Sequence, residues 1–263
     1  MFLSFLARLG QGLAAMLAAL GRLVLFAGAA LGGLCRPPFR LTLLGGHLLE
    51  IGYFSLPVVG LTAAFSGLVL ALQSYAGLAE LATPALAEAT TPRVVLAALV
   101  QELGPVLAGL MIAGRVGAAM AAELGTMRVS EQIDALHNLS TNPIAYLVSP
   151  RIAAATLALP LLVLVADLIG VGAGYLLAST RLGLSPEAYV RVTLEALSLY
   201  QVGIGLTKAA VFGFLIALIS TYQGFYSQGG AAGVGRATRQ AVVLSSIAIL
   251  AANYALTEGF FTT

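Results

Sequence analysis

The feature that most restricts the fold of this chain is a series of apolar runs that are long enough to cross a bilayer. A transmembrane helix needs about 20 apolar residues, and four runs reach that length: about 52–78, 94–122, 152–179 and 236–260. A fifth, about 203–226, qualifies if Lys208 is tolerated near its start. Only 9% of the residues are charged, against about 25% in soluble domains. The chain is therefore expected to be an all-α integral membrane protein with five transmembrane helices.

Other broad classes fit the composition poorly. The apolar runs lack the alternation of period two that membrane β-barrels show. One cysteine rules out a disulfide framework within the chain, and a net charge of +2 is too small to indicate a nucleic-acid partner. Because no linker or low-complexity tail is evident, residues 39–263 are expected to form a single membrane domain.

Residues 2–34 are apolar but are interrupted by Arg8, Gln11 and Arg22. The two arginines fall on nearly the same helix face, which is typical of an amphipathic helix in the membrane interface. A sixth span would bury Arg22 in hydrocarbon at a cost of about 2.5 kcal/mol or more. A cleaved signal peptide is the third alternative, although no suitable cleavage site follows. We expect residues 1–38 to form an interfacial helix and an elbow, broken at Arg36-Pro37-Pro38.

Arginine bias predicts the orientation in the membrane. With five spans, one side receives Arg8, Arg22, Arg36, Arg40, Arg128, Arg151, Arg236 and Arg239. The other side receives only Arg93, Arg181 and Arg191. The arginine-rich side is expected to be cytoplasmic, which places the N-terminus in the cytoplasm and the C-terminus outside.

A charged segment, residues 123–136, follows the second span and should lie in the cytoplasm. The helix from Arg93 to about Met127, with Gly104-Pro105 as its only expected kink, would be about 50 Å long against a hydrocarbon core of about 30 Å. It should therefore project beyond the membrane. Ser130 is the predicted N-cap of a short helix that follows.

This short helix carries an apolar stripe of Val129, Ile133 and Leu136, flanked by Glu131 and Asp134. The connection is longer than the 2–8 residues or so that usually join neighbouring helices. An apolar stripe outside the lipid indicates a helix that docks in the groove of a partner, although an ordinary solvated loop helix is the alternative.

The motifs in this region resemble those of the MlaE (YrbE) permeases, the membrane subunits of ABC transporters that move phospholipids with MCE-domain partners. The resemblance covers about residues 40–260 and rests on Glu102-Leu103-Gly104-Pro105, Ala113-Gly114-Arg115, Ala122-Glu123-Leu124-Gly125-Thr126-Met127, Ser130-Glu131-Gln132-Ile133-Asp134-Ala135-Leu136, Asn142-Pro143, Ser149-Pro150-Arg151 and Gly233-Val234-Gly235-Arg236-Ala237-Thr238.

The resemblance implies a homodimer in the bacterial inner membrane, paired with two cytoplasmic ATPases and a periplasmic MCE ring. It implies a lipid cavity at the dimer interface, open to the periplasm, and a role in maintaining outer-membrane lipid asymmetry. The coupling helix for the ATPase would be formed by Val129, Glu131, Gln132, Ile133, Asp134, Ala135 and Leu136. The chain has no phosphate-binding loop. It is therefore expected to be a non-catalytic subunit without a cofactor, with ATP and Mg bound by the partner chain.

Glu102 and Lys208, the only lysine, are expected at similar depth in the outer half of the membrane. A charge at such depth is a functional candidate, and the resemblance supports lipid binding at both positions. The alternative is a structural ion pair that only locks the second and fourth spans together.

Three further charged residues remain structural or functional candidates. Arg115 packs against another helix or reaches a lipid phosphate at the inner leaflet. Glu123 lies about 80° away around the same helix and need not face it. Asp167 lies in the middle of the third span and is protonated or hydrogen-bonded to a neighbouring helix. No metal site is expected.

Two other classes of function fit the sequence poorly. A transporter or channel driven by an ion gradient would show inverted repeats and paired carboxylates, which five spans and a lone Asp167 do not provide. An intramembrane enzyme would need a nucleophile and a base within the spans, where the chain has no histidine. Small-residue faces at Gly170 and Gly174 and at Ala113, Gly117 and Ala121 predict close helix packing.

Overall fold

The computed structural model describes residues 2–34, 41–81 and 83–261, and these residues form helices joined by short turns, with no strand among them. The α-helices are α1 (Phe2–Leu34), α2 (Leu41–Ile51), α3 (Leu56–Leu81), α4 (Pro84–Ala98), α5 (Gly104–Ile112), α6 (Ala118–Val129), α7 (Gln132–Asn138), α8 (Ser149–Thr180), α9 (Pro186–Ala196), α10 (Leu199–Phe225) and α11 (Gly230–Phe261). The all-α prediction is confirmed.

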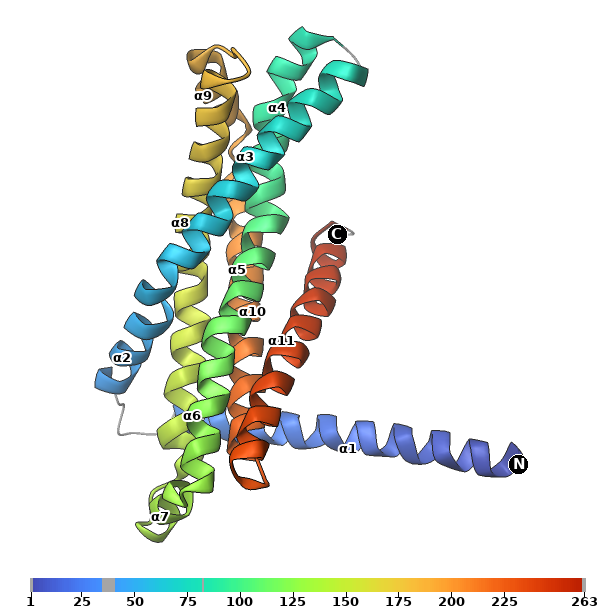
Figure 1. Cartoon of the computed structure of the whole chain (residues 1–263), viewed down its shortest axis with the longest axis vertical. Coiled ribbons are helices and arrows are strands. Elements are labelled where there is room, and N and C mark those ends of the chain that lie inside the picture. Colours follow the sequence, from blue (N-terminus) through green and yellow to red (C-terminus); the bar gives the residue numbers. More distant parts are fainter. Residues whose placement is uncertain (1, 35–40, 82, 262–263) are drawn as a thin grey trace.

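Six helical stretches of the described residues are long and apolar enough to cross a membrane. They are Leu17–Leu34, Thr42–Glu80, Ala85–Val129, Ile144–Thr180, Leu199–Phe225 and Gly230–Phe260. The last five correspond to the five predicted spans. The short helices α7 and α9 lie at opposite ends of the bundle (Figure 1), as expected of loops on opposite sides of a membrane.

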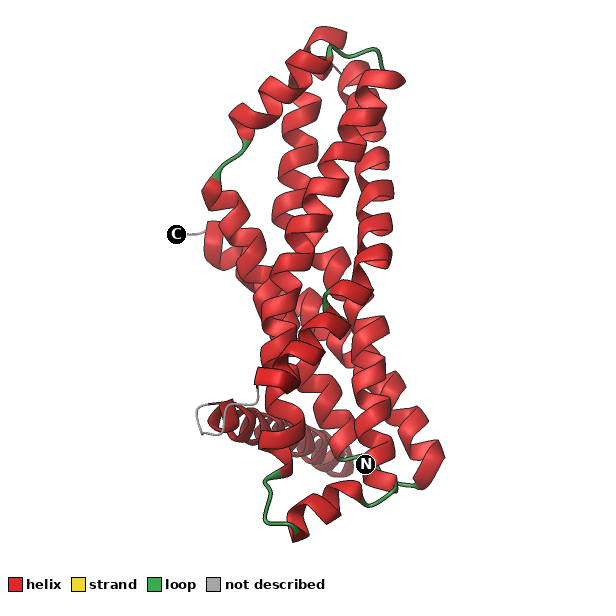
Figure 2. Ribbon diagram, turned by 90° about the vertical axis from the view of Figure 1, so that its left-hand side faces the viewer, coloured by secondary structure: helices red, strands yellow, loops and turns green. Residues whose placement is uncertain are grey.

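Helix α1 runs across the bundle near the end that carries α7 (Figure 1), and a view turned by 90° shows it foreshortened (Figure 2). Its contact with the bundle is specific, because the Ser149 hydroxyl donates to the carbonyl oxygen of Ala30 at 2.6 Å. The ring of Phe26 packs against Tyr222 and Phe225, with centroids 5.4 and 5.7 Å apart. This crosswise path supports an interfacial helix, which stays a prediction. The break at Arg36-Pro37-Pro38 and the side chain of Arg8 lie outside the described residues.

The second span is one long helix with two π-helical interruptions, Leu99–Leu103 and Ala113–Gly117. The first directly precedes Gly104-Pro105, where proline lacks the N–H that an α-helix would use. The second interruption was not expected and contains no proline, so Gly104-Pro105 does not mark the only irregularity of this helix. The helix also begins earlier than expected, at Pro84, where Thr83 caps it. The 45 residues Ala85–Val129 would extend over about 67 Å as a helix, which fits the predicted projection beyond the membrane.

Glycines allow α3 and α8 to pack backbone against backbone. A Cβ on Gly67 would overlap the carbonyl oxygen of Gly170, and a Cβ on Gly174 would lie 3.3 Å from the carbonyl oxygen of Gly67. Gly117 similarly faces Ser220 of α10. The predicted small-residue faces therefore bring these helices into close contact, as membrane helices commonly require.

Candidate functional site

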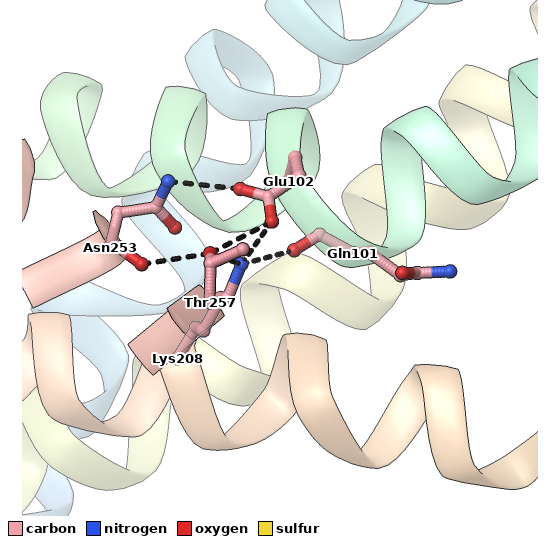
Figure 3. A network of polar contacts seen from close by, with 5 residues as sticks. All are labelled: Gln101, Glu102, Lys208, Asn253 and Thr257. Carbon is pink, nitrogen blue, oxygen red and sulfur yellow. Dashed lines mark hydrogen bonds and ion pairs between the residues drawn. The ribbon is translucent and has the colours of Figure 1, made fainter. Parts of the chain in front are cut away.

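A polar cluster lies between otherwise apolar helices. The ammonium of Lys208 donates to Glu102 Oε1 at 2.5 Å and to the carbonyl oxygen of Gln101 at 2.9 Å (Figure 3). It also donates to Thr257 Oγ1 at 2.8 Å. The amide of Asn253 donates to Glu102 Oε2 at 2.9 Å. The cluster therefore ties the long second helix to α10 and α11.

Local sequence explains how these side chains meet. Glu102 lies in the first π segment, and α10 approaches this segment closely because a Cβ on Gly205 would overlap the carbonyl oxygen of Val100. Lys208 follows Gly205 by nearly one helical turn and so faces the same segment. Asn253 and Thr257 are four residues apart on α11 and therefore share one face.

The burial of the Lys208 side chain favours the structural interpretation of this residue. Its side chain is fully buried, and three protein oxygens use its donors. Since an ammonium has three donors, none remains for a headgroup in this arrangement, and lipid binding by Lys208 stays a prediction. Glu102 is 37% exposed and is the residue of the pair that a ligand can reach. The structural pairing that locks the second and fourth spans is present.

Sequence reasoning missed Asn253 and Thr257, both of which hydrogen-bond within this cluster. A polar pair at a spacing of four residues on an apolar helix was the signal that could have identified them.

Asp167 is buried beside the same region. Its carboxylate lies against Gly104, where a Cβ would overlap Oδ1. Within the described part of the chain, Oδ1 has no hydrogen-bond partner, so the expected bond to a neighbouring helix is not formed by this atom. A cavity of about 10 Å³, with Thr62 and Ser66 in its wall, adjoins the carboxylate, which is close to the volume that one water molecule needs.

The remaining charged candidates lie nearer the α7 end. Arg115 donates to Ser55 Oγ at 2.6 Å and to the carbonyl oxygen of Glu50 at 3.5 Å, so it packs against a neighbouring helix, and contact with a lipid phosphate stays a prediction. Glu123 pairs instead with Arg151 at 2.7 Å, consistent with the prediction that Arg115 and Glu123 do not face each other.

Helix α7 is present but is organised differently from the prediction. Ser130 does not cap it; its hydroxyl donates back to Thr126 O in α6 at 2.8 Å. The residue before α7 is Glu131, which has a left-handed backbone with φ of 59°. Asp134 pairs with Arg128 at 2.7 Å, which holds α7 against the end of α6.

Two of the three residues of the apolar stripe, Ile133 and Leu136, are covered by the chain's own helices. Ile133 is only 2% exposed, and it packs with Leu124 and Leu147, with Leu136 partly buried against them. The chain's own helices already cover this face. The prediction that Ile133 contacts a partner is therefore wrong, and Leu136 is only partly accessible to one. The exposed members of the predicted coupling set are Val129, Glu131, Gln132, Asp134 and Ala135.

The family model described as Permease MlaE matches residues 44–258. The chain belongs to the MlaE permease family. Among its relatives, a "Probable ABC transporter permease protein" of Rickettsia felis is 54% identical over 92% of both chains. A protein of the same name from Rickettsia bellii is 49% identical over 99% of both chains. "Protein TRIGALACTOSYLDIACYLGLYCEROL 1, chloroplastic" of Arabidopsis thaliana is 38% identical over 82% of this chain and 60% of its own length.

As a member of this family, the chain is the multi-pass permease subunit of an ABC transporter. Such a transporter implies an ATPase partner. Family membership favours an ABC permease over a transporter driven by an ion gradient.

Proposed function

We propose that this permease moves phospholipids between the bacterial inner membrane and periplasmic MCE-protein carriers, and thereby maintains outer-membrane lipid asymmetry. The observation that carries the proposal is the partly exposed carboxylate of Glu102, held by Lys208 and Asn253 within apolar helices. Polar groups at such depth are costly and are usually functional. The name of the Arabidopsis relative contains a glycolipid, which also supports a lipid cargo.

A homodimer would complete the cargo site. Helix α11 presents large apolar side chains with little cover, namely Val243, Leu244, Ile247, Leu250 and Tyr254. The same helix supplies Asn253 and Thr257 to the polar cluster. A second copy against α11 would therefore bury these side chains and enclose Glu102 in a shared cavity, which the family resemblance expects to open toward the periplasm.

Energy would come from two cytoplasmic ATPases that bind ATP and Mg and dock against α7. The exposed residues Glu131, Gln132, Asp134 and Ala135 present a polar docking surface, while buried Ile133 joins that surface to the transmembrane helices. Movement of a docked ATPase would be transmitted through Ile133 to α6, which is the cytoplasmic end of the second span. With α7 on the cytoplasmic side, the N-terminus would lie in the cytoplasm and the C-terminus in the periplasm.

Photocrosslinking at Tyr254 tests the cargo site. A photoreactive residue at this position, next to Asn253 and beside the proposed shared cavity, should capture phospholipid in the purified transporter. The Glu102→Gln change should reduce that adduct without reducing the adduct formed at Leu168, an exposed position on α8. Equal adducts at Tyr254 with and without Glu102→Gln would contradict the cargo site.

A further inference from the structure

A second charged cavity lies toward the α7 end of the bundle. It has a volume of about 180 Å³, and its wall includes His47, Glu50, Arg115, Met120, Glu123 and Arg151. These residues come from α2, the second π segment, α6 and α8. At about 10–15 Å³ for one water molecule, the cavity has room for several waters or for a small polar headgroup.

The cavity lies close to the level of α1, the expected interfacial helix. Ser149 holds α1 through Ala30, and Arg151 follows Ser149 by two residues. Arg151 pairs with Glu123, which fixes the same level on α6. Arg115 precedes Glu123 by eight residues, or about 12 Å along the helix. The charged wall therefore extends from the expected membrane interface toward the bilayer interior.

One of the two arginines in this wall is already neutralised. Arg151 is 4% exposed, pairs with Glu123 at 2.7 Å and donates to the carbonyl oxygen of Leu147 at 2.6 Å. A buried arginine with a carboxylate and a carbonyl partner is a structural element. It leaves little attraction for an additional anion.

Arg115 is different. In the described ranges no carboxylate lies within 4 Å of its guanidinium, and its hydrogen bonds, to Ser55 Oγ and the carbonyl oxygen of Glu50, both use Nη1. The side chain is exposed. A guanidinium has five N–H donors in a planar fork that matches phosphate oxygens, and those on Nη2 and Nε remain for a ligand.

Glu50 supplies an opposite charge in the wall of the same cavity. Its carboxylate is 59% exposed and lies 3.7 Å from His47 Nδ1. With Arg151 and Glu123 cancelling each other, the wall presents one free cation and one exposed carboxylate. Separated charges of opposite sign complement a zwitterion better than they complement an ion of one sign.

The geometry points to a binding site for a phosphoethanolamine headgroup, with the phosphate on Arg115 and the ammonium on Glu50. The ligand is a lipid of the leaflet nearest α7. This inference does not rest on the cargo proposed above, because the cavity uses none of the residues around Glu102.

Native mass spectrometry of the full chain in mild detergent tests the site. The protein is offered phosphatidylethanolamine, phosphatidylcholine or phosphatidylglycerol, and retained lipid is counted. We expect phosphatidylethanolamine to be retained best and Arg115→Gln to lower its retention at least about tenfold, since a charge-assisted hydrogen bond contributes about that factor. Glu50→Gln should remove the preference for ethanolamine while leaving phosphate-dependent retention. Arg236→Gln, a change to an exposed arginine elsewhere, is the matched control and should change nothing.

Two further arms separate folding and free phosphate from headgroup binding. Ser55→Ala removes a hydrogen bond of Arg115 without changing charge, so its thermal midpoint reports the structural part of the loss, and its lipid retention should stay near that of the unchanged chain. Unchanged phosphatidylethanolamine retention in Arg115→Gln, or stronger retention of phosphatidylglycerol than of phosphatidylethanolamine, would overturn the site. Stabilisation of the delipidated chain by inorganic phosphate through Arg115, with no lipid preference, would overturn the headgroup and leave free phosphate as the ligand.

Discussion

Lys208 donates a hydrogen bond of 2.5 Å to Glu102, and the two side chains differ sharply in exposure, at 0% for Lys208 and 37% for Glu102. The lysine therefore acts as an internal support that holds a carboxylate at an accessible position. The pair spans 106 residues of sequence and joins the second span to the fourth.

Removing one member of this pair should cost more than removing both. Lys208→Met leaves the Glu102 carboxylate without its cation, and breaking a buried pair costs about 3–5 kcal/mol. That figure is an upper bound here, because Glu102 is partly exposed. The double variant Lys208→Met with Glu102→Gln should recover part of the loss. Thermal unfolding in detergent, analysed as a double-mutant cycle, measures the coupling; additive losses would show that the pair is not coupled.

The close packing of α3 on α8 gives a second prediction. Gly67→Ala places a methyl group on the carbonyl oxygen of Gly170 and should force the helices apart, which destabilises the folded protein. Gly172→Ala is the matched control, because no atom lies within 4 Å of its added Cβ. We expect a clearly lower thermal midpoint for the first variant and no loss for the second. Similar midpoints would contradict the backbone contact.

The two sides of α7 should respond differently to mutation. Ala135→Arg alters the exposed side and should reduce co-purification of the ATPase while the permease stays folded. Ile133→Ala removes a buried side chain and should lower the stability of the permease itself, by about 2–5 kcal/mol for a well-packed isoleucine.

The control for α7 is Glu187→Lys, a change on α9 at the opposite end of the bundle. It should leave both ATPase co-purification and thermal stability unchanged. Full ATPase recovery with Ala135→Arg would argue against docking at the exposed side of α7.

Tyr189 on α9 should make the protein sensitive to alkaline pH. Burial raises the pKa of Tyr189 to about 12, above the value of about 10 expected for the unfolded chain. The unfolded state therefore releases the phenolic proton first, and stability is lost as pH rises from about 10 to about 12. No hydrogen-bond partner for the hydroxyl is present among the described residues.

Tyr189→Phe should therefore reduce this alkaline loss without lowering stability at neutral pH. Thermal midpoints at about pH 8 and pH 11 measure the difference. Tyr254→Phe, at a position that is 69% exposed, should behave like the unchanged chain. An equal alkaline loss in Tyr189→Phe would exclude Tyr189 as its source.

Sequence patterns alone were enough to predict the helical membrane fold, the five apolar spans and the short helix after the second span. These features follow from the length, hydropathy and turn residues of contiguous segments, which need no knowledge of neighbours in space. Family membership was also readable from contiguous motifs such as Glu102-Leu103-Gly104-Pro105.

Which groups are partners and which are accessible became clear only from the packing of the helices in space. Glu123 forms an ion pair with Arg151. Lys208 hydrogen-bonds to Thr257 and Glu102 and is buried between them. Ile133 packs against Leu124. Each outcome depends on how helices far apart in sequence cross and rotate against one another. The hydrophobic pattern of α7 identified an apolar face correctly, but a pattern within one helix does not say whether the chain's own helices or another protein will cover that face.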